Sequence, residues 1–146
     1  MTNFELGDQL ISHDTDATVA AYSEIANGGA ERCGCADCRN FILQRANAYP
    51  QDFLNLLSRL GIDVSKEGEA FHYGPANDDE PLYGGWFYFV GTLIEAGSRA
   101  KIERAAQSGF RYWFSNNFPR PPRCFGKDVA AVEFVTRIPW ELEQSP

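Results

Sequence analysis

The spacing of apolar residues changes near Glu69, from a helical repeat before it to an alternating repeat after it. Before that point, apolar residues recur three and four positions apart, which places them on one face of a helix. After it, aromatic and β-branched residues alternate with polar ones between turn residues, as is typical of strands. Helices first and strands later predict an α+β fold, with N-terminal helices packed on a C-terminal antiparallel sheet.

Three helices are predicted in the first half of the chain. The first covers residues 15–27 and ends at two consecutive glycines, which favour helix termination. The second begins near Cys38 and ends at Pro50, because proline is tolerated at a helix start and disfavoured inside it. The third runs from Pro50 to Gly61, and its leucines and phenylalanine form one wide apolar stripe that predicts burial.

Four strands are predicted in the second half, at residues 70–73, 86–94, 110–115 and 129–138. In the last of these, every second residue from Ala130 to Ile138 belongs to one face, and Glu133 and Arg137 belong to the other. We therefore expect a half-solvated antiparallel strand. In the strand predicted at 86–94, Trp86 and Tyr88 lie on the opposite face from Phe87 and Phe89. We expect helices on one of these faces and a long loop on the other, and the alternative is that one face is a binding surface.

The length of the chain, 146 residues, is that of one ordinary domain, so we expect residues 1–146 to fold together. No apolar run approaches the roughly 20 residues that a membrane helix needs, which argues against a membrane protein. The first residues lack the basic flank and apolar segment of a secretory signal. A cytoplasmic location is therefore expected.

The net charge of −7 is unevenly distributed. Residues 1–31 hold six acidic side chains and no Lys or Arg, whereas residues 97–127 hold seven Lys and Arg against Glu103 alone. The overall sign argues against general nucleic-acid binding, because phosphate affinity needs clustered positive charge. The acidic half would suit a basic protein partner, and the alternative is that the two segments are neighbours that neutralise one another.

Three of the four cysteines fall within residues 33–38, a concentration that stands out from the rest of the chain. Zinc prefers thiolate and imidazole ligands in a tetrahedral array. The spacing of Cys35 and Cys38 lets two sulfurs converge on one ion, and Gly34 permits a tight turn before them. The sequence therefore predicts a zinc-binding turn.

The remaining ligands are less closely determined, because only one such paired turn is present. Cys33 is the candidate third ligand. Cys124 is the predicted fourth ligand, and His72 and His13 are the alternatives. All three candidates for the fourth position are distant in sequence from the turn.

Two other interpretations of the cysteines remain open. In the first, Cys35 or Cys38 is a redox-active thiol whose thiolate is stabilised by a helix N-terminus and by Arg39. The absence of a buried strand before the motif argues against a thioredoxin-like unit. In the second, the cysteines are small buried hydrophobic residues without a ligand.

A second group of polar residues, Glu67, Glu69 and His72, could supply an acid, a base or a metal ligand if it lay in a cleft. Nothing in the sequence indicates a cleft there. We therefore expect these residues to lie along an exposed strand edge.

Several short motifs occur together in this chain: Cys33-Gly34-Cys35, Cys38-Arg39-Asn40-Phe41, Leu60-Gly61-Ile62-Asp63, Tyr83-Gly84-Gly85-Trp86-Phe87 and Pro139-Trp140. This set resembles a family of uncharacterised bacterial proteins, a domain of unknown function with a Cys-Gly-Cys-x-x-Cys-Arg-Asn-Phe motif. The resemblance spans most of the chain and implies a bacterial, stand-alone protein of one domain. It implies no catalytic residue.

The sequence thus favours a small non-enzymatic binding or interaction protein, of the immunity or adaptor type, with a structural zinc site in the cysteine turn. Its small size, negative charge and lack of an evident acid, base and nucleophile set favour association over catalysis. The alternative is a thiol-based redox protein or enzyme that uses Cys35 and Cys38.

Overall fold

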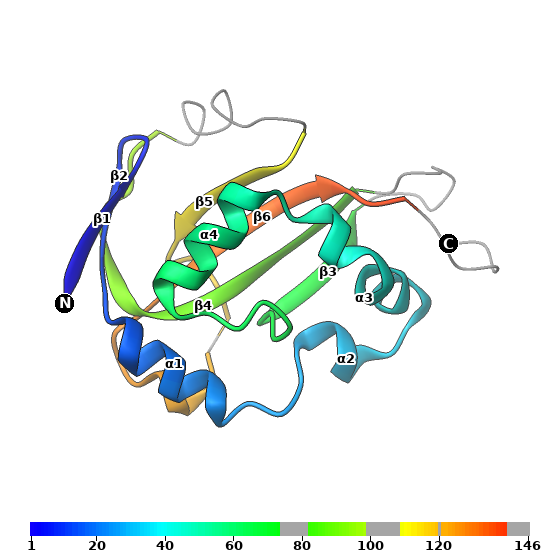
Figure 1. Ribbon diagram of the computed structural model, residues 1–146, viewed down its shortest axis with the longest axis horizontal. Coiled ribbons are helices and arrows are strands. Elements are labelled where there is room, and N and C mark those ends of the chain that lie inside the picture. The colour runs from blue at the N-terminus through cyan, green and yellow to red at the C-terminus, as the bar shows by residue number, and fades with distance from the viewer. Residues whose placement is uncertain (74–81, 99–108, 120, 140–146) are drawn as a thin grey trace.

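The computed structural model (Figure 1) describes residues 1–73, 82–98, 109–119 and 121–139. The described helices are α1 (Thr15–Ser23), α2 (Gly29–Cys33), α3 (Ala36–Ala48) and α4 (Gln51–Leu60), with a short 3-10 helix, η1 (Arg123–Phe125). The strands are β1 (Thr2–Leu6), β2 (Gln9–His13), β3 (Glu69–Tyr73), β4 (Leu82–Glu95), β5 (Arg111–Ser115) and β6 (Val129–Arg137). The predicted α+β class is confirmed, and most strands follow the helices.

All strand pairs in the sheet are antiparallel. The strand order is β1-β2-β4-β6-β5, and β3 also pairs with β4. The 14 residues of β4 make it the centre of the sheet: residues 82–86 pair with β3, residues 91–95 pair with β2, and β6 lies along the other edge. One long strand therefore joins two short ones into a single surface.

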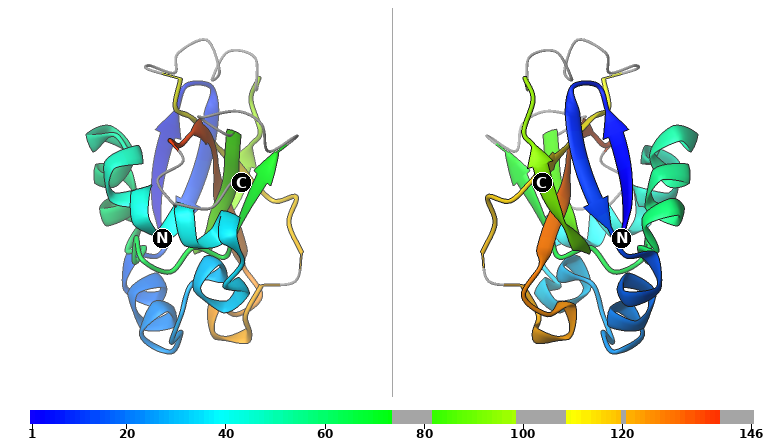
Figure 2. Two further views of the ribbon diagram at one scale, coloured as in Figure 1. Left: turned by 90° about the vertical axis from the view of Figure 1, so that its right-hand side faces the viewer. Right: turned by 90° about the vertical axis from the view of Figure 1, so that its left-hand side faces the viewer.

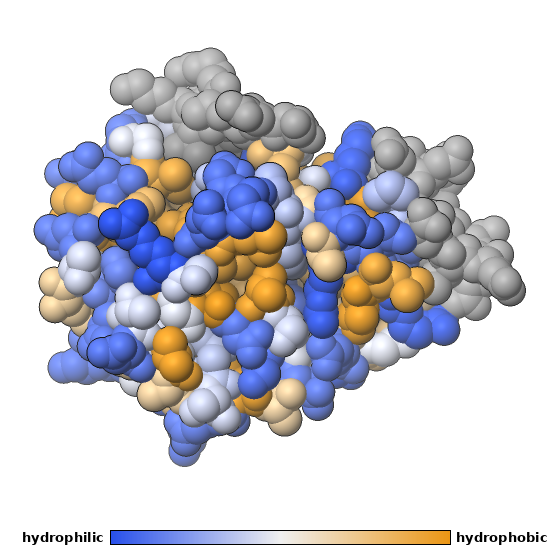
Figure 3. All heavy atoms as spheres, viewed as in Figure 1, coloured by the Kyte–Doolittle hydropathy of each residue, from blue (hydrophilic) through white to orange (hydrophobic). Residues whose placement is uncertain are grey.

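Helices α3 and α4 cover one face of this sheet (Figures 1 and 2). Their aromatic side chains meet those of β4 and β6: the ring of Phe41 lies 6.2 Å from that of Phe134, and the ring of Phe53 lies 6.2 Å from that of Phe87. These four side chains are fully buried or nearly so. Burial of such large apolar surfaces supplies most of the favourable free energy of a fold of this kind. Viewed from the same side, apolar side chains at the surface form separate groups among polar ones (Figure 3).

The other face of the sheet is covered by the segment between β5 and β6 (Figure 2). The ring of Tyr88 lies 5.2 Å from that of Phe118 and 5.7 Å from that of Phe125, which belongs to η1. The expected alternation, with Tyr88 and Phe87 on opposite faces, is confirmed. The expectation that β6 is half-solvated is only partly met, because Ala131 and Val135 are also buried.

The N-terminal hairpin of β1 and β2 was not predicted. Its strands are five residues each, and Leu6 pairs with Gln9 across a two-residue turn at Gly7, where φ is +57°. A two-residue turn that begins with glycine between alternating segments is a hairpin signal, but each of the two segments is only five residues long, which weakens it. In the structure β2 is stabilised by pairing with the far half of β4.

The first helix is shorter than predicted and ends at Ser23, with Asp14 as its cap through a 3.0 Å bond from Ala17 N to Asp14 Oδ1. Gly28 and Gly29 do not end α1, as the sequence predicted, but lie at the start of α2. Gly29 begins α2, and a Cβ at this position would lie 2.8 Å from the carbonyl oxygen of Gly68. Glycine is therefore required there for the close approach of two backbones.

None of the helices in the described ranges is long and apolar enough to span a membrane. Much of the basic segment lies outside the described residues, namely Arg99, Lys101, Arg104 and Arg120, as does Trp140 of the motif set. The proposed neutralisation of the acidic half by this segment therefore stays a prediction.

Candidate metal centre

The cysteine turn, residues 33–38, connects α2 to α3 through a sharp change of backbone direction. Cys33 is the last residue of α2, and Gly34 follows it in the left-handed conformation, with φ +69°. Cys35 then caps α3, since its Sγ accepts a hydrogen bond of 3.4 Å from the backbone N–H of Cys38. The glycine allows the reversal that returns Cys35 toward Cys33, because a side chain disfavours this value of φ.

The turn brings three sulfur atoms together. The Sγ atoms of Cys33, Cys35 and Cys38 all lie within 4.8 Å of one another. Cys33 and Cys35 are exposed and Cys38 is buried. Because a Zn–S bond is about 2.3 Å long, sulfurs in a tetrahedral zinc site lie about 3.8 Å apart. A small contraction of this group would therefore give the spacing of a soft-metal site.

Cys33 and Cys38 differ in acidity. The pKa of Cys33 is lowered, because its sulfur accepts hydrogen bonds from the backbone N–H of Cys35 and from the thiols of Cys35 and Cys38, although the charge of Glu69 opposes the effect. Burial raises the pKa of Cys38, and hydrogen bonding to the other two thiols adds to this. The exposed Cys33 is therefore more acidic than the buried Cys38. Thiolate formation is the condition for both metal binding and nucleophilic reaction.

The predicted fourth ligand, Cys124, lies elsewhere in the fold. It belongs to η1, where burial and the neighbouring charge of Glu24 raise its pKa. Of the four cysteines predicted as ligands, the structure brings three together and places Cys124 apart. The sequence contained no information on this point, because Cys124 is distant from the turn and its position depends on how the segment after β5 crosses the sheet.

The two histidines also have different positions. His13 is buried in β2, with Nδ1 3.3 Å from the hydroxyl oxygen of Thr15. His72, in β3, lies beside the cysteine turn: its Nδ1 is 3.9 Å from a carboxylate oxygen of Asp37. The His72 side chain is only 8% exposed, and within the described ranges its buried Nε2 has no hydrogen-bond partner. His72 therefore contacts a residue of the turn, although neither of its ring nitrogens belongs to the group of ligand atoms within 4.8 Å of one another.

The underlying strand holds the cysteine turn in place. Tyr83 of β4 donates a 2.8 Å hydrogen bond from its hydroxyl to the carbonyl oxygen of Asp37. The buried Asn40 of α3 donates to the same hydroxyl at 3.4 Å and to the carbonyl oxygen of Pro139 at 3.1 Å. Burial raises the pKa of Tyr83 to about 12, so the hydroxyl remains a donor at neutral pH.

A buried carboxylate fixes the other side of the turn. The Glu67 side chain is completely buried, its Oε1 accepts a 3.0 Å hydrogen bond from Ala30 N, and its Oε2 lies 3.2 Å from Arg45 of α3. The backbone N–H of Gly29 donates to the Glu67 carbonyl oxygen at 2.8 Å. Burial raises the pKa of Glu67 against these opposing bonds. Glu67 therefore ties α2 to α3 and to the start of β3.

The expectation that Glu67, Glu69 and His72 follow an exposed strand edge is wrong for two of them. Glu69 is exposed, but Glu67 is completely buried and the His72 side chain is nearly so. A single acidic residue before a predicted strand carries no signal of burial. Its role becomes visible only when α2 and α3 are seen to converge on it.

Comparison of the chain with protein-family models, with curated proteins and with solved structures finds no match in any of the three. The resemblance to a family of uncharacterised bacterial proteins therefore stays a prediction.

Proposed function

We propose that Cys33, Cys35 and Cys38 bind one zinc ion, which stabilises the α2–α3 corner of a small non-enzymatic interaction protein. The observation that carries the proposal is the convergence of three sulfur atoms within 4.8 Å of one another, at a turn whose backbone already has the required reversal. Thiolates are soft ligands and select zinc over hard cations. Lowering of the Cys33 pKa further favours binding near neutral pH.

His72 is proposed as the fourth ligand. It lies against Asp37 in the middle of the motif, and its buried Nε2 lacks a partner within the described part of the chain. A neutral imidazole and three thiolates would complete a closed tetrahedral site, which is the usual form of structural zinc. A closed site adds to stability and supplies no open position for a substrate.

The acidic N-terminal half is proposed to meet a basic protein partner, as in immunity or adaptor proteins. Glu5, Asp16 and Glu24 are exposed in the structure. Complementary charge accelerates association and selects among partners, with strong dependence on salt. A triple E5Q/D16N/E24Q variant should keep its melting temperature and lose captured partners that wild type retains at low salt. Retention of the same partners would refute this part of the proposal.

A thiol-based redox role is the second candidate, and the acidity of Cys33 favours it. An exposed cysteine with a lowered pKa beside a second exposed cysteine is suited to nucleophilic attack and disulfide exchange. The residues differ from those expected from sequence, because Cys38 is buried with a raised pKa and is poorly suited to attack. Cys33 and Cys35 are the pair that this candidate would use.

Elemental analysis of protein purified without an affinity tag tests the zinc proposal. We expect one zinc per chain, lost in C33S, C35S and C38S, reduced in H72Q and retained in C124S and H13Q, which are the matched controls. Modification of the native thiols should be slow until a chelator is added. Metal-free protein with immediate modification of Cys33 would overturn the proposal in favour of redox chemistry, and loss of zinc in C124S would overturn the ligand set.

A further inference from the structure

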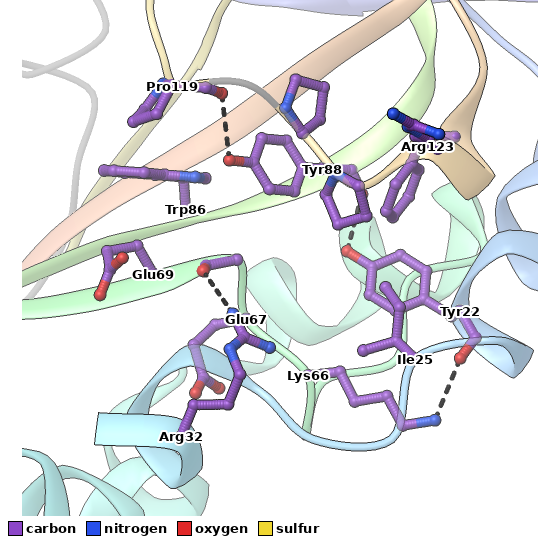
Figure 4. Close-up of a pocket in the computed structure, with 14 residues that line it drawn as sticks. Tyr22, Ile25, Arg32, Lys66, Glu67, Glu69, Trp86, Tyr88, Pro119 and Arg123 are labelled. Atoms are coloured by element: carbon purple, nitrogen blue, oxygen red, sulfur yellow. Dashed lines mark hydrogen bonds between the residues drawn. The ribbon is translucent and has the colours of Figure 1, made fainter. Parts of the chain in front are cut away.

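A pocket of about 400 Å³ lies on the loop-covered face of the sheet, away from the helix-covered core (Figure 4). Its floor is formed by Trp86 and Tyr88 of β4, and its other walls come from the end of α1, the start of β3 and the segment that contains η1. Ligand pockets in proteins have volumes of about 300–1,000 Å³. The hollow is therefore large enough for a small organic molecule.

The walls are flat and apolar. Four aromatic side chains and three prolines line the pocket: Tyr22, Trp86, Tyr88, Phe125, Pro119, Pro121 and Pro122. The Tyr22 hydroxyl donates to the Tyr88 carbonyl oxygen at 2.7 Å, and the rings of Tyr22 and Phe125 lie 5.2 Å apart, edge to face. Aromatic faces held in this way favour a planar ring, because stacked and edge-to-face contacts are most favourable between flat groups.

Three cations border the same pocket. Arg32, Lys66 and Arg123 line it, and Arg123 lies on the opposite side from Arg32 (Figure 4). Arg32 donates to the carbonyl oxygens of Asn27 at 2.6 Å and Gly68 at 3.3 Å. Of the ion pairs formed within the described residues, none involves Arg32 or Arg123. Both guanidinium charges are thus available to a ligand.

The acidic side chains of the pocket do not cancel these charges. Glu67 is already paired with Arg45 at 3.2 Å, and Lys66 is paired with Asp63 at 3.6 Å. Glu69 remains as the one exposed carboxylate in the lining against the two arginines. A locally positive pocket in a chain of net charge −7 indicates selection for a negatively charged ligand.

We propose that this pocket binds a small anion with a flat aromatic body, of the aromatic carboxylate class. The ring would lie against Trp86 and Tyr88, and the carboxylate would accept hydrogen bonds from the guanidinium of Arg32 or Arg123. Arginine binds carboxylates in a bidentate manner, which adds geometric selection to charge. This site uses none of the three clustered cysteines, but it adjoins the proposed zinc site, because Arg32 directly precedes Cys33 in α2.

Titration with three matched probes tests the proposal: 2-naphthoate, the uncharged 2-naphthamide, and cationic 2-naphthylmethylamine. In ¹H–¹⁵N spectra, 2-naphthoate should shift the amides of Arg32 and Gly68 and the indole N–H of Trp86, and should bind at least about tenfold more tightly than 2-naphthamide. Three outcomes would each overturn the proposal: equal affinity for 2-naphthoate and 2-naphthamide, tightest binding of the cationic probe by the aromatic walls, or no shift at millimolar 2-naphthoate.

Single substitutions at exposed arginines complete the test. Whichever of R32Q and R123Q removes the guanidinium that binds the carboxylate should weaken 2-naphthoate binding about tenfold, and both variants should leave 2-naphthamide binding unchanged. K127Q removes an exposed cation outside this pocket and is the matched control, with unchanged affinity expected. W86L should weaken both probes, because it removes the stacking surface. Unfolding curves that match wild type establish that each variant is folded, and unchanged 2-naphthoate affinity in R32Q and R123Q together would refute the proposal.

Discussion

The two faces of the sheet are covered in different ways, and the difference separates stability from binding. On the helix-covered face, Phe87 and Phe134 are at most 1% exposed and pack on α4 and α3 respectively. On the loop-covered face, Trp86 is only half-buried and a hollow of about 400 Å³ remains. Helices present regular rows of side chains that can fill the space above a sheet. An irregular segment that contains prolines lacks such rows and leaves part of the space above the sheet unfilled.

The largest effect should come from deleting a side chain in the helix-covered core. F87A removes a fully buried ring and leaves a cavity among Phe53, Tyr49 and Phe134, so we expect the free energy of unfolding to fall by about 3–5 kcal/mol. W86A, on the loop-covered face, should cost less than half as much, because this side chain already borders a hollow. Urea denaturation measures both, and equal losses would break the proposed contrast between the faces.

A smaller loss of stability is expected at Glu67, which joins α2 to α3. E67A removes the acceptor of Ala30 N and the buried partner of Arg45, so we expect a loss of about 3 kcal/mol. The matched control is E31Q, which removes the more exposed partner of the same arginine and should cost less than 1 kcal/mol. Urea denaturation provides the measurement, and similar losses in the two variants would contradict the anchoring role of Glu67.

The smallest effect is a difference in reactivity between the thiol of Cys33, in the cysteine turn, and that of Cys124, in η1. Alkylation of metal-free protein by iodoacetamide should be faster at Cys33, whose pKa is lowered, than at Cys124, whose pKa is raised by burial. As the pH falls from 9 to 6, the rate at Cys33 should decline later, because its thiolate persists to lower pH. Peptide mass spectrometry measures both rates, and unfolding in urea should make them alike. Equal rates in the folded protein would refute the predicted acidity of Cys33.

Local signals in the sequence predicted the elements that local chemistry decides. Pro50 precedes α4 and Gly61 ends it with φ +82°, as the positions of proline and glycine indicated. The alternation of aromatic residues placed Phe87 and Tyr88 on opposite faces, and the α+β class followed from the change in periodicity. The spacing of Cys35 and Cys38 predicted a turn on which sulfurs could converge, and the structure places three sulfurs within 4.8 Å of one another.

Contacts between segments distant in sequence were decided only by the tertiary structure. The hairpin of β1 and β2 depends on pairing with the far end of β4, and Gly29 is needed because α2 crosses the backbone at Gly68. The same assembly places His72 rather than Cys124 beside the cysteine turn, buries Glu67 between two helices, and leaves the hollow over Trp86. Propensity and periodicity act over a few neighbouring residues, whereas these features depend on which surfaces the assembled sheet leaves covered or open.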